Sequence, residues 1–150
     1  MDWMWQNAEK IGNLAQVLIL VVAVIAVAFA YVQIRAATAS QREATAKSLY
    51  NDYLTLAFQH PQYATPSQAL ITDDKYRWFV AILLNSSDEI LKVGGHKIWE
   101  DIIATDLKYH KSYLTSSAFE TDQGWNLYSP TLRQIFDSRV LNQSDRTSDA

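Results

Sequence analysis

The chain opens with a long apolar run and continues with apolar residues at helical spacing. No charged residue occurs between Lys10 and Arg35, and aliphatic side chains dominate the interval from Ile11 to Ile34. A helix needs roughly 20 apolar residues to cross about 30 Å of hydrocarbon. The pattern therefore predicts a transmembrane helix over residues 13–34, after a short N-terminal flank of residues 1–12.

A cleaved signal peptide is the alternative interpretation of this run. Signal peptides have an apolar core of about 7–15 residues followed by small residues at the cleavage site, and Ala37-Thr38-Ala39 has that form. Arg35 separates those residues from an apolar run that is longer than such a core, so we favour an uncleaved anchor. A buried core helix fits poorly, because so small a domain could hardly cover it on all sides.

Aromatic and basic residues at both ends of the run are typical of a membrane interface. Trp3, Trp5 and Tyr31 lie where interfacial aromatic residues belong, and Arg35 marks the end of the span. We expect these four residues to be interfacial anchors, with the lipid bilayer as their partner.

Basic residues near the two ends predict the orientation. The N-terminal flank has Lys10 alone, whereas Arg35, Arg42 and Lys47 follow the span. Positively charged flanks stay in the cytoplasm. The N-terminus is therefore expected outside and the C-terminal domain in the cytoplasm.

Three alanines fall on one face of the predicted span. Ala23, Ala26 and Ala30 are spaced at i, i+3 and i+7, and such faces let helices approach closely in lipid. We interpret them as a helix-packing face for a membrane partner; the alternative is that alanine is simply common in membrane helices.

The helix is expected to continue beyond the membrane as a stalk over residues 35–60. The segment from Gln33 to Ala46 is rich in strong helix formers, and an amphipathic stripe follows it. Proline disfavours helix in the residue before it, so His60-Pro61 predicts the end of a helix that runs from about Asn13 to Gln59. The alanine-rich collar from Ala36 to Ala46 is either a bare stalk or a contact with another chain. The stripe consists of Leu49, Tyr53, Leu56 and Ala57.

Residues 61–141 are predicted to form a small helical domain, followed by a polar tail over residues 142–150. Pro61 and Pro66 bracket an expected loop, and a short helix through Leu70 follows it. Acidic residues that favour a helix N-terminus begin a helix that Gly94-Gly95 ends, and Asn85-Ser86-Ser87 suggests a kink in it. Its predicted buried stripe is Tyr76, Phe79, Val80, Leu83, Ile90 and Leu91.

A further long helix is predicted from His96 to about Ser116–Phe119, and a last helix is predicted after Ser129-Pro130. The first carries apolar or aromatic residues at intervals of three and four, and Gly124 lies in a turn between the two helices. No useful period-2 pattern occurs, so the fold class is all-α: one transmembrane helix continuing into a long helix that packs in a small soluble helical domain. The two stripes comprise Trp99, Ile102, Ile103, Tyr109, Tyr113 and Leu114, and Leu132, Ile135 and Phe136.

Composition and charge narrow the possible chemistry. The 150 residues carry a net charge of -3 and no cysteine. Disulfides and thiol chemistry are excluded, and a mildly acidic chain without a clustered basic face argues against nucleic-acid binding.

No residue pattern predicts catalysis, and we expect no enzyme activity, cofactor or metal. Asp106 and His110 are four apart on one helix. They could ligate a metal, or one could act as a general base that the other orients, but no further residue completes such a site. A surface ion pair or a satisfied hydrogen bond is the favoured interpretation. The neighbouring acids Asp73-Asp74 and Glu100-Asp101 point apart on a helix, so neither is a natural acid–base dyad.

Four aromatic residues are expected to form core. They are Trp78, Trp99, Tyr113 and Trp125; a ligand-stacking cage is the alternative.

The layout resembles a loose group of uncharacterised bacterial single-pass membrane proteins with a small helical cytoplasmic domain. The matching stretches are "YVQIRAATASQREATAKSLYNDYLTLAFQHPQY", "YRWFVAILLNSSDEIL", "IWEDIIATDLKYHKSYLTSSAF" and "YSPTLRQIFD". The resemblance implies a location in the bacterial inner membrane, the same fold and the same topology. It implies no activity and no site residues.

Three functional hypotheses follow. The first is a non-catalytic accessory or scaffolding subunit that binds a larger membrane complex or a second copy of itself. The second is a membrane-anchored sensor or effector whose helical domain binds a small ligand. The third, an enzyme using Asp106 and His110, has the least support in the sequence.

Overall fold

The structure, a computed structural model, describes residues 2–94, 97–122 and 124–142, and every regular element within them is helical. The first and longest element is α1 (Asp2–Gln59). It begins well before the expected Asn13, because residues 2–12 are mostly helix formers and the single Gly12 costs only about 1 kcal/mol in a helix. It ends at Gln59, before His60-Pro61, as predicted.

The chain divides into two compact units, of which the first ends at Gln41. The described part of this unit belongs to α1 alone. Within Leu18–Gln59 an 18-residue window has a mean hydropathy of 2.4, and none of that window is buried. A helix of this length and composition fits a membrane anchor and an N-terminal signal sequence alike.

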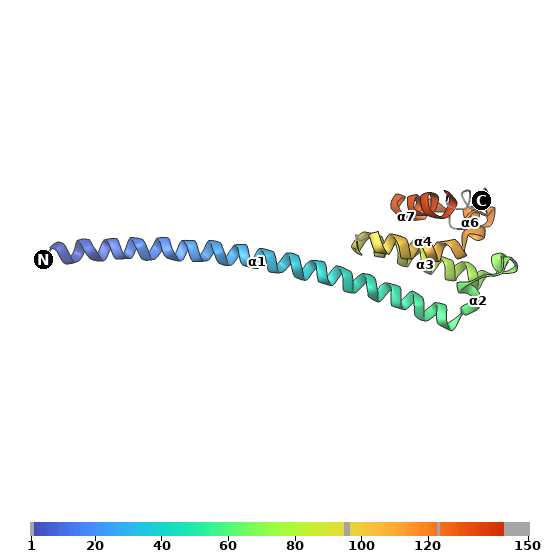
Figure 1. Ribbon diagram of the computed structural model, residues 1–150, viewed down its shortest axis with the longest axis horizontal. Coiled ribbons are helices and arrows are strands. Elements are labelled where there is room, and N and C mark those ends of the chain that lie inside the picture. Colours follow the sequence, from blue (N-terminus) through green and yellow to red (C-terminus); the bar gives the residue numbers. More distant parts are fainter. Residues whose placement is uncertain (1, 95–96, 123, 143–150) are drawn as a thin grey trace, which may run out of the picture. The chain divides into compact units, whose positions relative to one another are not determined.

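The second unit begins at Arg42 and contains the end of α1 and all later helices. Figure 1 shows α3 and α4 lying side by side in this unit. The last helices, α7 and η3, pack against α3 and α4 respectively. The helices are α2 (Pro61–Ala64), η1 (Gln68–Thr72), α3 (Asp74–Gly94), α4 (Lys97–Tyr109), α5 (Lys111–Leu114), α6 (Ser117–Asp122), η2 (Trp125–Leu127), α7 (Pro130–Ile135) and the π-helical η3 (Phe136–Leu141).

A core rich in aromatic side chains joins these helices. Tyr53 of α1 meets Phe79 of α3 with ring centroids 5.7 Å apart. Further along, Phe119 of α6 contacts Trp125 of η2 at 5.3 Å, and Trp125 contacts Phe136 of η3 at 4.8 Å. The predicted stripe of α3 is confirmed, since all its members are buried except the half-buried Leu91.

The end of the alanine-rich collar belongs to this core. Ala46 is 0 % exposed, and both Ala46 and Trp99 of α4 lie beside Gly94 of α3. Glu43 accepts a hydrogen bond of 3.3 Å from Nε1 of Trp99. The interpretation of the collar as a bare stalk is therefore wrong at Ala46, where a small side chain lets α1 approach Gly94 of α3.

Three local expectations change. The segment after Pro61 is not a loop but begins the short helix α2, with Pro61 at a position where a missing N–H costs nothing. The residues Asn85-Ser86-Ser87 do not interrupt α3. The long helix expected from His96 divides at His110, which is the N-cap of α5 and lies buried.

Two caps agree with the sequence pattern. Ser129 Oγ accepts a hydrogen bond of 3.3 Å from the Leu132 amide at the start of α7. Asp73 Oδ1 accepts one of 2.9 Å from the Lys75 amide at the start of α3. Both satisfy a backbone donor that the first helical turn leaves free.

We expect Gly94→Ala to lower the free energy of unfolding by about 1–2 kcal/mol. The added methyl group would crowd its neighbours, and this cost exceeds the gain in helix propensity of alanine over glycine. An added Cβ would lie 2.8 Å from Cδ1 of the buried Trp99. The measurement is denaturant unfolding of the full chain in detergent micelles, followed by tryptophan fluorescence.

Asn85→Ala, at an exposed site on the same helix, is the matched control and should change stability by less than about 0.5 kcal/mol. Equal stability of the Gly94→Ala variant and the wild type would contradict the packing of Trp99 against Gly94.

Candidate functional site

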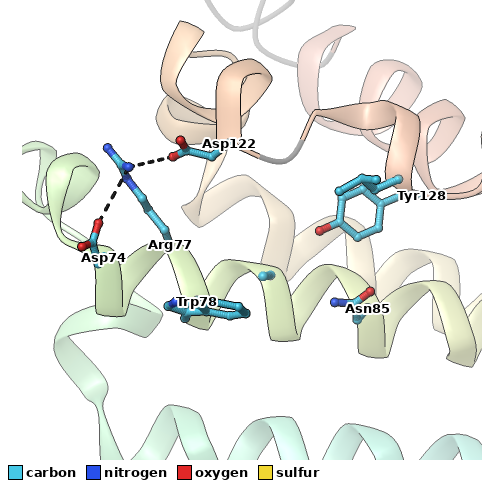
Figure 2. A pocket seen from close by; sticks show the side chains of 8 residues that line it. Asp74, Arg77, Trp78, Asn85, Asp122 and Tyr128 are labelled. Atoms are coloured by element: carbon cyan, nitrogen blue, oxygen red, sulfur yellow. Dashed lines mark ion pairs between the residues drawn. The ribbon is translucent and has the colours of Figure 1, made fainter.

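An open groove of about 460 Å³ lies between α3 and the α6–η2 segment of the second unit. We call it the Trp78 groove. Figure 2 shows the ion pairs of Arg77 at one end and Tyr128 and Asn85 at the other. The groove is lined by Asp74, Arg77, Trp78, Ala81, Asn85, Asp122, Leu127 and Tyr128.

Helical spacing places one wall of the groove along α3. Asp74, Trp78, Ala81 and Asn85 recur at intervals of three and four, and such positions share one helix face. The cap at Asp73 lies at the start of the helix, next to the first of these positions. The small Ala81 leaves room between the larger neighbours.

A glycine turn builds the opposite wall. Gly124 has φ of 63°, a conformation that L side chains rarely adopt, and its amide donates a hydrogen bond of 2.8 Å to the Phe119 carbonyl. The turn reverses the chain after α6, and the buried Trp125 anchors it in the core. Leu127 and Tyr128 are thereby brought to face α3.

The charges in the groove are unbalanced. Arg77 forms an ion pair of 2.8 Å with Asp122 and a longer one of 3.8 Å with Asp74. Its Nε also donates to the Ile71 carbonyl at 3.3 Å. Two carboxylates thus face one guanidinium among the lining residues, and the Asp74 side chain is 88 % exposed.

Trp78 is the most unusual residue of the groove. It is 72 % exposed, although Trp99 and Trp125 in the same unit are buried. Its other side borders a second hollow of about 380 Å³, which we call the apolar hollow. The exposed Trp78 therefore forms a ridge between two depressions. The apolar hollow is lined by Leu56, His60, Tyr63, Lys75, Trp78, Phe79 and Ile82.

Burial also affects the pKa of a groove residue. Tyr128 stacks edge-on against Trp125 at 6.3 Å. Burial first, and then the neighbouring Tyr113 and Asp88, raise the pKa of Tyr128 to about 12. Its phenol is consequently neutral at physiological pH and serves as a hydrogen-bonding wall rather than as a base.

The structure separates the predicted Asp106–His110 pair. His110 is 1 % exposed, and its Nδ1 forms a hydrogen bond of 3.0 Å with the hydroxyl of Tyr76. Asp106 instead accepts a hydrogen bond of 3.1 Å from the Tyr50 hydroxyl. Of the two expected roles, the surface ion pair is wrong, because the helix divides at His110 and turns the imidazole into the core, whereas a hydrogen bond to another residue is found for both His110 and Asp106.

His110 is held in its neutral form. Burial lowers its pKa to about 4, since a charged imidazole would lose its hydration there. Among the described residues, no hydrogen-bond partner meets His110 Nε2 or the hydroxyl of the buried Tyr113. A neutral imidazole that solvent does not reach suits a structural role rather than proton transfer to a substrate.

The other acidic pairs have structural partners. Asp73 accepts a hydrogen bond of 3.1 Å from the Tyr63 hydroxyl in addition to capping α3. Glu100 and Asp101 both bind the guanidinium of Arg139 on η3. The two acids were expected to point apart, but the broad guanidinium reaches both of them.

The candidate membrane residues lie on α1. Ala23, Ala26 and Ala30 are exposed in the first unit, and nothing within the described part of the chain covers them. Tyr31 and Arg35 are also exposed, with the Arg35 guanidinium carbon 5.7 Å from the Tyr31 ring centroid. The side chains of the predicted anchors Trp3 and Trp5 lie outside the described residues.

The aromatic prediction is right for three residues and wrong for Trp78. Trp99, Tyr113 and Trp125 are buried, as expected of core. Trp78 lies on the face of α3 opposite the buried Tyr76, Val80 and Leu83. That signal was present in the sequence, because position 78 is out of phase with the buried stripe. The same phase argument would have identified Asp74 and Asn85 as its neighbours.

No family model, curated protein or solved structure matches the chain. Within the described residues, no group of three or more His, Cys, Asp or Glu side chains forms a metal site. The Trp78 groove and the adjoining ridge are therefore the candidate site on geometric grounds alone.

We expect protonation of His110 to contribute a loss of stability on the order of 3 kcal/mol as the pH falls from about 6.5 to about 4. The folded-state pKa of His110 lies below its unfolded value, so the unfolded chain takes up the proton first. Thermal unfolding of the full chain in detergent, compared between wild type and His110→Asn, isolates this contribution.

The stability of the His110→Asn variant should fall less steeply than that of the wild type between about pH 6.5 and about pH 4, whatever its stability at neutral pH. His60→Asn, which alters an exposed histidine, should retain the wild-type slope. Parallel pH profiles for wild type and His110→Asn would contradict a neutral buried imidazole.

Proposed function

We propose that the protein is a non-catalytic, single-pass membrane protein whose cytoplasmic helical domain binds another membrane protein subunit or a second copy of itself. The observation that carries this proposal is the exposed Trp78 ridge between two hollows. An accessory or scaffolding subunit needs a binding surface of this kind and does not need catalytic residues.

The energetics of tryptophan support a binding role. Burying apolar surface contributes about 25 cal/mol per Å², and tryptophan is enriched among the residues that dominate interface energies. Trp78 obtains little of this contribution in the isolated chain, because 72 % of it stays in water. A partner that covers the ridge would recover it.

The proposed anchor is the apolar part of α1. Its mean hydropathy of 2.4 and its unburied side chains suit lipid. The excess of Arg35, Arg42 and Lys47 over Lys10 favours a cytoplasmic C-terminal domain, and the resemblance noted above suggests the bacterial inner membrane. Ala23, Ala26 and Ala30 offer a second contact surface, within the bilayer.

The groove also favours a second candidate function, a sensor or effector that binds a small ligand. Ligand pockets typically hold about 300–1,000 Å³ and combine apolar walls with a few polar groups. The Trp78 groove, of about 460 Å³, has Trp78 and Tyr128 in its walls and Asn85 at one end. Its openness to solvent fits a protein surface better than an enclosing ligand site.

We expect a photoreactive amino acid in place of Trp78 to form a discrete crosslinked product in native membranes, because that position would lie in the interface. The same amino acid in place of Ile98, which is also exposed but lines neither hollow, serves as the control. Gel analysis of the full-length protein after irradiation reports the products.

A product at position 78 that is absent at position 98 supports the proposed function. If neither variant forms a crosslinked product in membranes from the native host, the proposed function is contradicted.

The orientation has its own test. A C-terminal reporter enzyme that is active only in the cytoplasm should be active when fused to the full chain, and one that is active only outside should be silent. Moving the basic residues, by changing Arg35, Arg42 and Lys47 to glutamine and adding lysines before Lys10, should reverse the two signals. A silent cytoplasmic reporter on the unaltered chain would exclude the proposed topology.

A further inference from the structure

We propose that the Trp78 groove receives an arginine or lysine side chain from a partner polypeptide, placed over the indole of Trp78 with Asp74 as its counter-charge. This inference rests on the proposed function and specifies the chemistry of the partner at this site. Three observations carry it: the exposed indole, the unbalanced carboxylates and the apolar surface that continues beyond the groove.

The indole and a carboxylate are neighbours on α3. Asp74 and Trp78 are four residues apart, a spacing that places them next to each other on a helix surface. A cation over a tryptophan ring is attracted by the negative face of the ring. A carboxylate beside the ring adds a direct ionic attraction, so the pair recognises a cation better than either group alone.

The existing ion pairs leave Asp74 available. Asp122 holds Arg77 at 2.8 Å, whereas Asp74 lies 3.8 Å from the same guanidinium. Its carboxylate is 88 % exposed, so a partner can reach it from solvent. A neutral partner that covered this end of the groove would remove water from Asp74 without replacing that water by a charge, which is costly.

An anionic partner fits this groove poorly. Asp74 and Asp122 would repel it, and Arg77, the one basic lining residue within the described part of the chain, already binds Asp122 and the Ile71 carbonyl. Lys75 lines the apolar hollow on the other side of Trp78. The ridge thus has an acidic side and a basic side, which gives a docked segment a preferred direction.

The extent of the apolar surface indicates a polypeptide rather than a free small cation. Trp78 borders both hollows, and Ile82 in the second and Leu127 in the first also expose large apolar areas. A small cation in the groove would leave the apolar hollow in water. A chain segment that crosses Trp78 covers both sides of the ridge while it delivers one cationic side chain to Asp74.

The test uses the full chain in an uncharged detergent, with its five tryptophans replaced by 5-fluorotryptophan and the Trp78 fluorine signal assigned with Trp78→Phe. The probes are capped tripeptides, Leu-Arg-Leu, Leu-citrulline-Leu and Leu-Glu-Leu, and tetramethylammonium chloride. Citrulline matches arginine in shape but has no charge. At millimolar concentration we expect the arginine peptide to shift the Trp78 signal and leave the other tryptophan signals in place.

The arginine peptide should bind roughly two- to fivefold more tightly than the citrulline peptide, and Asp74→Asn should abolish that difference. Asp52→Asn, which removes an exposed carboxylate outside the groove, should preserve it. The unchanged signals of the other tryptophans verify that each variant is folded.

Several results would overturn the inference. They are equal binding of the arginine and citrulline peptides, tighter binding of the glutamate peptide, no shift of Trp78 with any probe, or retention of the arginine preference in Asp74→Asn. Tetramethylammonium binding as strong as that of the arginine peptide would overturn the polypeptide assignment in favour of a free cation. None of these results would change the crosslinking expected through position 78 in membranes. The proposed function is therefore tested independently of this inference.

Discussion

Contacts between aromatic rings hold the helical domain together, and most of its other features follow from them. Tyr50 and Tyr53 of α1 meet Trp99 and Phe79, so the end of the long helix becomes part of the core. The series continues through Tyr76, Tyr113, Phe119, Trp125 and Phe136 to the last helix. A domain of about 100 residues buries a limited fraction of its surface, and large rings bury about 150–250 Å² each. The short helices α2, α5 and α6, too short to be stable alone, are thereby held by the rings they carry.

This core decides what its polar members can do. Tyr76 and His110 share a hydrogen bond within it, and the imidazole stays neutral because its surroundings offer little hydration. The same burial raises the pKa of Tyr76, so its hydroxyl keeps its proton. The groups that looked most reactive in the sequence are thus fixed in structural roles, and the accessible chemistry lies outside the core.

One face of helix α3 packs in the core, and the other face lines the candidate site. Phe79, Val80 and Leu83 face inward, whereas Trp78 and Asp74 face the groove. A rigid helix whose inner face is fixed by packing presents its outer side chains in defined positions, which suits recognition without catalysis. The turn at Gly124 completes the groove from a segment distant in sequence, and the buried Trp125 keeps that turn in place.

The sequence by itself determined the all-helical class, the apolar N-terminal helix, its end before Pro61, the buried stripe of α3 and the cap at Ser129, because these depend on local spacing and on the backbone preferences of proline and glycine. It also contained the phase signal that places Trp78 opposite the core. The tertiary structure alone decided that His110 divides a helix, that Ala46 lies against Gly94, and that Arg77 meets Asp122 across a groove. Those features depend on which helix faces pack together, and residues far apart in sequence carry no local pattern that specifies their partners.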